Sequence, residues 1–341
     1  MSGAAFGLVA VQPVRFTPAR AVLLLGTLAL LAAGAMVLSV LLGEYRLHLG
    51  VALTDPSSAD ARVLLGLRLP RAVLGALVGA ALAASGSALQ ALLRNPLADP
   101  FVLGVSGGAA LGTTLALALG LLAVAGPSLF AFAGAVGAMV LVLGAGRARS
   151  SPYAALLTGV VFNAFASAVI TCVKTLLTPD QVGEILYWLA GTLGYERLRT
   201  LAVAAVIQAV ALGVLWRESG RLNLLTLGDD EAASLGVPVR RTRWWVLIAA
   251  SLSVAGAVAL SGLIGFVGLI VPHLLRLWLG PDQRLLVPAS ALGGAAFLVI
   301  ADLLTRLLFP VFHAEPPVGV VTAVLGGPLF VWLLHRREGV A

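Results

Sequence analysis

Cysteine and lysine are almost absent from this sequence. Cys172 is the single cysteine among 341 residues, so no disulfide can form within the chain and no thiol-rich metal site exists. Lys174 is the only lysine, and no Gly-x-x-x-x-Gly-Lys-Ser/Thr loop is present, which excludes nucleotide binding of the P-loop type. Zinc-protease and nucleophile-elbow motifs are also missing, and the four histidines fall in separate segments. We therefore predict no catalytic residue and no metal site.

Charge is scarce as well, and this scarcity sets the protein class. Only 11% of the residues are charged, whereas 60% are hydrophobic and the mean hydropathy is +1.03. In soluble domains roughly a quarter of the residues are charged. A helix that crosses a bilayer needs about 20 mostly apolar residues, and this chain offers many such runs separated by short polar breaks. The composition predicts an all-α polytopic membrane protein.

Ten apolar runs are candidates for transmembrane helices. A cytoplasmic N-terminal segment (1–20) precedes a single transmembrane domain (21–334), and a cytoplasmic tail (335–341) follows it. The predicted spans are 21–42, 72–93, 107–124, 129–143, 152–177, 201–216, 244–260, 265–279, 288–308 and 317–334.

The distribution of basic residues predicts the orientation. With both termini in the cytoplasm, fourteen of the 22 basic residues lie on the cytoplasmic side. The positive-inside rule favours this arrangement in the inner membrane. It also explains the net charge of +7 by membrane topology, so we expect lipid but no nucleic acid as a partner.

One cytoplasmic loop is unusually polar. Residues 222–237 read LNLLTLGDDEAASLGV, with three acids in a row followed by a glycine and a proline. Acids in a first turn and a glycine after the last turn are helix signals. We predict a short helix near 228–236. Because an isolated helix of this length is unstable in water, another surface must hold it.

Four separated stretches carry a resemblance to a known family. They are LRLPRAVLGALVGAALAASGSALQALLRNPLADPFVLGVSGGAALG (67–112), the loop LNLLTLGDDEAASLGV, SGLIGFVGLIVPHLLRL (261–277) and PPVGVVTAVLGGPLFVWLL (316–334). In this order they resemble the permease subunits of type II ABC importers, which take up ferric siderophores, haem and cobalamin. The resemblance implies ten helices per subunit, a second permease subunit, two ATPase subunits and a periplasmic solute-binding protein. It also places ATP and magnesium on the ATPase and implies no cofactor on this chain.

The resemblance identifies the polar loop as the coupling helix, which transmits ATPase movement. In this role the leucines fill an apolar cleft of the ATPase, the glycines flank the helix, and the acids meet basic groups at the rim of the cleft. The residues assigned to this role are Leu224, Leu225, Leu227, Gly228, Asp229, Asp230, Glu231, Leu235 and Gly236. The alternative is that the loop folds back on Arg240, Arg241 and Arg243 of its own chain.

Three arginines depart from the positive-inside pattern. Arg68 and Arg71 flank a proline at the start of the second span, and Arg306 lies near the outer end of the ninth. The resemblance implies that they receive glutamates of the binding protein. Alternatively they snorkel or pair locally, since Asp302 lies four residues before Arg306.

Polar residues in the fifth span share one helical face. Asn163, Ser167, Thr171 and Lys174 are spaced by four, four and three residues. Such a stripe lines a translocation path, or it satisfies neighbouring helices. The following segment (181–193) resembles the family's short outer helix, an expected gate.

Other functions remain as alternatives. A secondary transporter would need intramembrane carboxylates, and Asp302 is the only acid well inside a predicted span. A passive channel would not need a coupling helix. Among substrates we expect a ferric siderophore first, with haem and cobalamin as alternatives, and we expect a homodimer rather than a pair with a paralogue.

Overall fold

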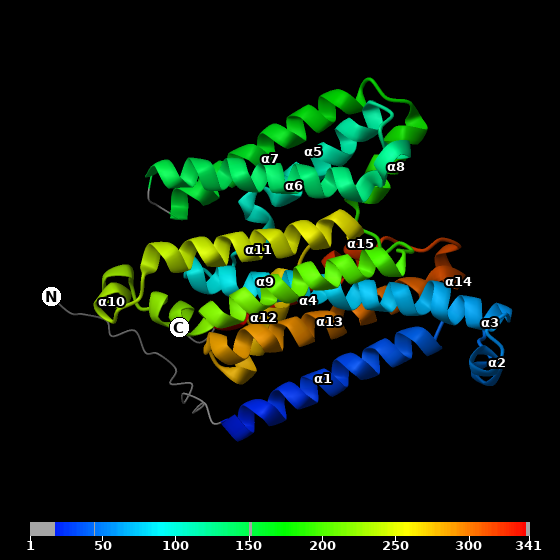
Figure 1. The fold of residues 1–341 in the computed structure, drawn as a ribbon, viewed down its shortest axis with the longest axis horizontal. Coiled ribbons are helices and arrows are strands. Elements are labelled where there is room, and N and C mark those ends of the chain that lie inside the picture. Colours follow the sequence, from blue (N-terminus) through cyan, green and yellow to red (C-terminus); the bar gives the residue numbers. More distant parts are fainter. Residues whose placement is uncertain (1–17, 44, 150–151, 339–341) are drawn as a thin grey trace.

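The computed structural model describes residues 18–43, 45–149 and 152–338, and every regular element in these residues is helical (Figure 1). The longest helices are α1 (Pro18–Leu41), α4 (Leu69–Leu92), α6 (Leu122–Arg149), α7 (Pro152–Lys174), α9 (Leu198–Leu225), α11 (Val239–Ser261) and α13 (Gln283–Leu307). Three further apolar helices are α5 (Val105–Ala118), α12 (Val267–Leu279) and α15 (Val318–Glu338). The short elements are α2 (Leu49–Thr54), α3 (Ala59–Arg62), η1 (Val63–Arg68), η2 (Pro100–Leu103), α8 (Pro179–Leu189), α10 (Asp229–Ser234) and α14 (Phe309–Phe312).

Helix α4 is the centre of the bundle. It packs against α13, α11, α9 and α12, while α1 lies on the far side of α13 (Figure 1). The group formed by α5, α6 and α7 covers the opposite side and reaches the centre through contacts of α6 and α5 with α11. Small residues dominate α4, and most of its residues are buried.

Two glycines let the backbone of α4 come into direct contact with the backbones of α13 and α12. A Cβ atom at Gly79 would lie 2.1 Å from the carbonyl oxygen of Gly294 in α13. At Gly86 it would lie 1.8 Å from the carbonyl oxygen of Gly268 in α12. Small residues allow such close packing between helices in a bilayer, where van der Waals contact drives association. These two contacts therefore fix the position of α4.

Each of the ten predicted spans overlaps one of these ten apolar helices over most of its length. Among the described residues, seven helical segments are long and apolar enough to cross a membrane. The other three, α5, α12 and the apolar part of α15 (318–331), are shorter. The all-α polytopic architecture is confirmed, and the exact number of ten spans stays a prediction.

Several predicted boundaries are wrong. The second span does not begin at residue 72, because α3, η1 and α4 form one helical run from Ala59. The third ends at Ala118, and Gly120, with a φ of 69°, forms the turn to α6. The sixth continues to Leu225, so the first part of the predicted loop is helical.

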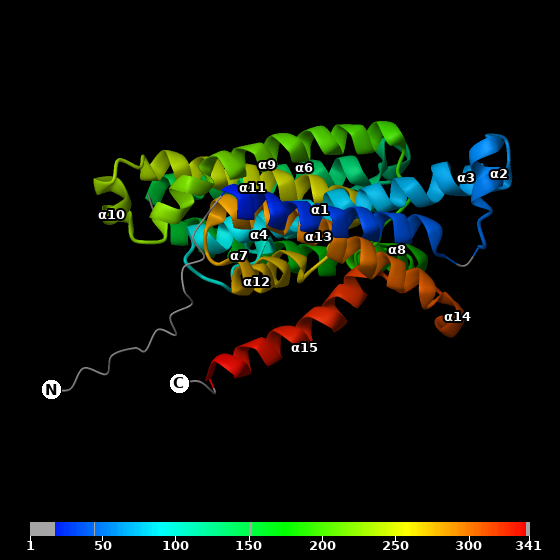
Figure 2. The ribbon, with the colours of Figure 1, turned by 90° about the horizontal axis from the view of Figure 1, so that it is seen from below.

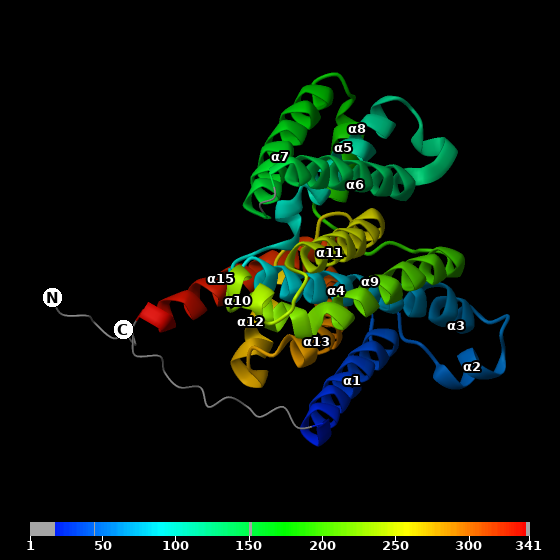
Figure 3. The ribbon, with the colours of Figure 1, turned by 60° about the vertical axis from the view of Figure 1, so that its left-hand side comes forward.

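The two ends of the bundle carry different helices. Helix α10, the start of α1 and the end of α15 lie at one end, and α2, α3 and α14 lie at the other (Figures 1 and 2). Helix α15 diverges from the bundle toward the α10 end (Figures 2 and 3). Residues 1–17 of the predicted N-terminal segment and 339–341 of the predicted tail are outside the described residues.

Replacing Gly86 by leucine should prevent normal packing of α4. The added side chain has no room against the Gly268 backbone, so we expect loss of most monodisperse protein in detergent, measured by size-exclusion chromatography. Gly34→Leu is the matched control, because a Cβ at Gly34 in α1 meets nothing within 4 Å. Equal yields of the two variants would contradict the close contact.

Candidate functional site

The short helix α10 is held by an ionic cluster of its own chain. Asp229, at its first position, accepts a hydrogen bond of 2.6 Å from Nη2 of Arg94 and forms an ion pair with Arg243 of α11. Arg94 follows α4 and also donates from Nε to the carbonyl oxygen of Leu225 at the end of α9 (2.8 Å). We call Arg94, Asp229 and Arg243 the Asp229 cluster. It joins α10 to the ends of α4, α9 and α11.

The electrostatics of the Asp229 cluster favour the charged carboxylate. Partial burial raises the pKa of Asp229, but hydrogen bonds and charges from Arg243 and Arg94 outweigh it and lower the pKa below its usual value. A carboxyl group with a depressed pKa stabilises the fold above its unfolded-state pKa, and that contribution is lost as the pH falls through the folded-state pKa. The cluster is therefore fully charged at neutral pH.

The tip of α10 remains exposed beyond this cluster. Asp230 and Glu231 are exposed, and Leu227 and Leu235 are 63% and 59% exposed. Gly228 and Gly236, which flank the helix, have positive φ values. The loop thus presents two leucines beside two carboxylates at the end of the bundle.

Two of the predicted coupling residues lie elsewhere. Leu225 is only 1% exposed and belongs to the core, so the prediction that it fills a partner's cleft is wrong. Leu224 is half-buried in the last turn of α9 and packs against the core. Of the basic residues in the fold-back alternative, Arg243 does bind the loop, through Asp229.

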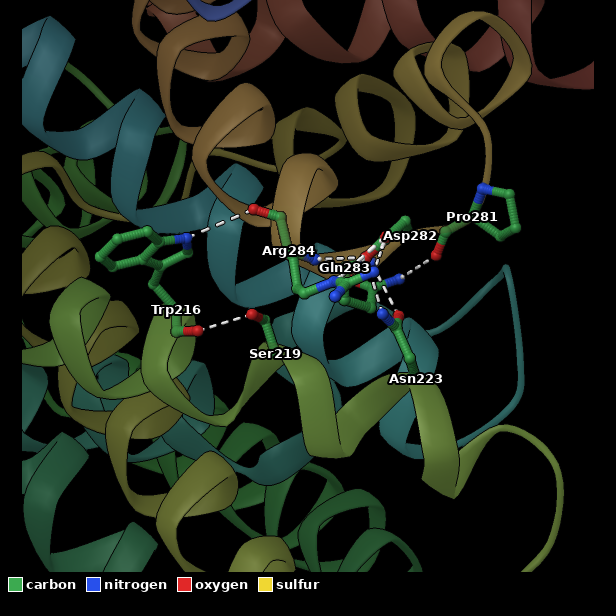
Figure 4. Close-up of polar contacts among 7 residues, drawn as sticks. All are labelled: Trp216, Ser219, Asn223, Pro281, Asp282, Gln283 and Arg284. Carbon is green, nitrogen blue, oxygen red and sulfur yellow. Dashed lines mark hydrogen bonds and ion pairs between the residues drawn. The ribbon is translucent and has the colours of Figure 1, made fainter. Parts of the chain in front are cut away.

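A second polar contact set anchors α9 near the same end (Figure 4). Asn223 donates to Oδ1 of Asp282 (2.7 Å) and accepts from the backbone N–H of Gln283 (2.8 Å). Trp216 donates from its indole to the carbonyl oxygen of Arg284 (3.3 Å). These bonds tie the part of α9 that leads into α10 to the turn between α12 and α13. No local sequence pattern predicts this pairing, because the partners are about 60 residues apart.

The opposite end of the bundle holds the three arginines that were predicted to dock a binding protein. Arg68 is 7% exposed and donates to the carbonyl oxygens of Val40 and Leu41 at the end of α1 (3.0 and 2.9 Å). Backbone carbonyls at a helix end lack intrahelical partners, so this arginine caps α1. It faces its own chain rather than solvent.

Arg71 and Arg306 share one buried carboxylate. Arg71 lies 3.0 Å from Asp302 and 2.8 Å from Glu315, and Arg306 lies 3.3 Å from Asp302. We call Arg71, Asp302, Arg306 and Glu315 the Asp302 cluster. The local pairing of Asp302 with Arg306 is therefore present. The role of these arginines in docking a binding protein stays a prediction.

A cavity of about 300 Å³ opens next to the Asp302 cluster. Arg71, Tyr187, Tyr195 and Glu315 contribute to its wall. The guanidinium of Arg71 lies 5.9 Å from the centre of the Tyr195 ring, within the range of a cation–π contact. Of the arginines predicted for docking, Arg71 is the one that lines this cavity.

The predicted stripe on α7 is divided between two directions. Asn163 accepts from the backbone N–H of Gly107 and donates to the carbonyl oxygen of Phe101, both at 3.1 Å, so it joins α7 to α5 and η2. Ser167 and Thr171 are exposed, and Lys174 is half-buried in the last turn. The structure therefore gives Asn163 a packing role and leaves Ser167 and Thr171 exposed.

The predicted short outer helix corresponds to α8, which begins two residues before the predicted 181 and ends four before 193. Thr178 and Gln181 form a capping box at its start. At its other end the N–H of Thr192 donates to the carbonyl oxygen of Ser261 (2.8 Å), and the N–H of Gly319 donates to that of Gly191 (3.1 Å). Helix α8 is thus attached to the ends of α11 and α15.

Comparison with known proteins decides the family. The sequence profile of the FecCD transport family matches residues 2–336. This chain belongs to the FecCD transport family. It is a permease subunit of an ABC importer with no ATPase chemistry of its own, because ATP hydrolysis belongs to a separate subunit.

Individual relatives agree with this membership. The chain is 44% identical over 281 residues to a cobalamin import system permease of Halobacterium salinarum, covering 82% of this chain and 75% of that protein. It is 41% identical over 293 residues to a hemin transport system permease of Yersinia pestis, covering 84% and 86%. A solved inward-facing structure of a metal-chelate type ABC transporter matches with a TM-score of 0.81 and 32% identity, covering 92% of this FecCD chain and 99% of that chain. The predicted type II importer fold is confirmed.

Replacing Asp302 by asparagine should destabilise the FecCD chain. Arg71 and Arg306 would lose the buried countercharge that they share, and breaking such a pair costs about 3 kcal/mol or more. We expect a clearly lower apparent Tm in detergent. Asp180→Asn, on the exposed side of α8, is the control and should leave the Tm unchanged. An unchanged Tm for Asp302→Asn would show that the cluster contributes little.

Proposed function

We propose that two copies of this permease, two ATPase subunits and a periplasmic binding protein form an inner-membrane importer that moves a metal chelate into the cytoplasm. The observation that carries the proposal is the geometry of α10. It is the exposed polar helix of a family whose members are importer permeases, and it is joined to three long helices. The end of the bundle that carries α10, the start of α1 and the end of α15 is then the cytoplasmic one.

In this proposal α10 is the coupling helix. Leu227 and Leu235 enter an apolar cleft of the ATPase, and Asp230 and Glu231 meet basic groups at its rim. Asp229 has a different role, because its carboxylate is already bound by Arg94 and Arg243. Movement of α10 then reaches α4 and α11 through the Asp229 cluster.

The translocation path lies along the exposed side of α7. Few residues of this helix are buried in the single chain, so its outer face is available to a second permease copy or to the path between the two. Ser167, Thr171 and Lys174 lie on that side. The charge of Lys174 near the outer mouth would meet an anionic chelate.

Docking of the binding protein involves the outer end. Arg71 faces the cavity beside Tyr195 and Glu315, where an incoming carboxylate could reach it. Arg68 and Arg306 support the site through the end of α1, since both donate to carbonyl oxygens there. Complementary charges across an interface speed the encounter of two proteins more than they add affinity.

A secondary transporter fits the structure poorly. Ion-coupled transport needs an intramembrane carboxylate that can exchange its ion, and Asp302 lies between two arginines. For the substrate, relatives named for cobalamin, hemin and iron chelatin are 44%, 41% and 39% identical to this chain. These three sequence identities are too similar to identify the substrate. We keep a ferric siderophore as first choice, with haem and cobalamin as alternatives.

Leu227→Asp should uncouple ATP hydrolysis from transport. The substitution places a charge in the proposed apolar contact with the ATPase. Because Leu227 is exposed in the permease itself, the permease should still fold and insert, and the complex should still assemble. We expect at least a tenfold loss of uptake in vesicles with ATPase activity retained. The control is Leu176→Asp, a residue 82% exposed that lies two residues after the end of α7 and far from α10. Undiminished transport by Leu227→Asp would refute the coupling role.

Uptake in cells that lack this permease identifies the substrate. Cells with the binding protein and ATPase are supplied in turn with a radio-iron siderophore, haem and labelled cobalamin, with and without the permease. We expect the permease to restore uptake of one of the three. Restoration of none, with the ATPase co-purifying, would place the substrate outside this set and contradict the proposed substrate class.

A further inference from the structure

A second surface feature near α10 has no part in the proposed transport cycle. A groove of about 690 Å³ runs along the first turns of α11. Its wall includes Pro238, Arg240, Arg241, Trp244, Trp245 and Ile248. All of these residues belong to one helix or directly precede it, so the groove follows the axis of α11.

The groove changes in chemical character along that axis. Arg240, Trp244 and Ile248 are four residues apart and share one face, and Arg241 and Trp245 form a second row beside them. At a rise of 1.5 Å per residue, the tryptophans lie about 6 Å beyond the arginines and Ile248 lies about 12 Å beyond them. The order is cationic, then aromatic, then aliphatic.

The two arginines lack countercharges of their own. Both are exposed, and no ion pair with an acidic residue reaches either of them within the described ranges. The first turn of α11 contains no acid. Arg243 differs, because Asp229 already neutralises it. Arg240 and Arg241 therefore present two positive charges to whatever occupies the groove.

We propose that this groove binds an anionic phospholipid of the cytoplasmic leaflet. Arg240 and Arg241 hold the phosphate and the charged headgroup, and the tryptophans lie at the glycerol level, where their amphipathic rings are favoured. Ile248 contacts the upper acyl chain. Basic pockets at the cytoplasmic ends of spanning helices are suited to anionic headgroups, and each basic residue contributes about 1 kcal/mol.

The order of residues separates a lipid from a soluble partner. An ATPase subunit in the cytoplasm could meet the arginines, but it would not extend about 12 Å along a spanning helix into the hydrocarbon region. A phospholipid matches all three zones in one molecule. The inference concerns a face of α11 and is independent of the substrate that the importer carries.

Tryptophan quenching by a brominated phospholipid tests the proposal. The assembled transporter is placed in nanodiscs of phosphatidylcholine, and phosphatidylglycerol with brominated acyl chains is titrated. We expect quenching at a low mole fraction, and we expect Trp245→Phe to remove part of it. In Arg240→Gln with Arg241→Gln the midpoint should rise about 30-fold, the equivalent of about 2 kcal/mol for two basic residues.

The matched control removes two charges at the same end of the bundle. Arg20 and Arg217 are exposed on α1 and α9, outside the groove, and Arg20→Gln with Arg217→Gln should leave the midpoint unchanged. Equal quenching by brominated phosphatidylcholine would overturn the proposal. So would an unchanged midpoint in the groove variant, and loss of the ATPase from that variant with unchanged quenching would assign the groove to the ATPase instead.

Discussion

The close contact of α4 with α12 and α13 is the constraint on which the rest of the structure depends. Gly79 and Gly86 bring backbones together at distances that no side chain would permit. In a bilayer, where lipid tails are as apolar as the helices, contact of this kind is what holds spanning helices together. It fixes α4 at the centre, and every other long helix except α7 is placed by packing on α4 or on a neighbour of α4.

The central position of α4 gives its two ends particular importance. Arg71, in its first turn, enters the Asp302 cluster, and Arg94, just beyond its last turn, enters the Asp229 cluster. About 24 residues of continuous helix separate the clusters, a length of about 36 Å. Since the buried interior is closely packed, a shift at one end is transmitted along the helix instead of being absorbed. The Asp229 cluster, which holds α10, and the Asp302 cluster, which lies beside the cavity, are thus attached to the same helix.

Composition and hydrophobic runs were sufficient to predict the helical membrane class and the approximate place of each long helix. The predicted boundaries were wrong where polar residues continue a helix, as α9 does after Trp216, or where a glycine ends it, as at Gly120. The outer arginines were found because they violate the charge rule, but their partners were not all foreseen. Glu315 and Asn223 meet residues more than fifty positions away, and no local pattern encodes such contacts. The role of Arg94 was also missed, although Arg94 lies within the first of the four stretches that carry the family resemblance.

The Asp229 cluster has a consequence for how tightly α10 can be bound. A helix of six residues would be largely unfolded by itself, and a partner that had to fold it would lose part of its binding energy to the ordering of the backbone. Arg94 and Arg243 meet that cost within the permease before any partner arrives. The exposed leucines and acids of α10 are therefore preorganised, so a small contact surface can support a stable association.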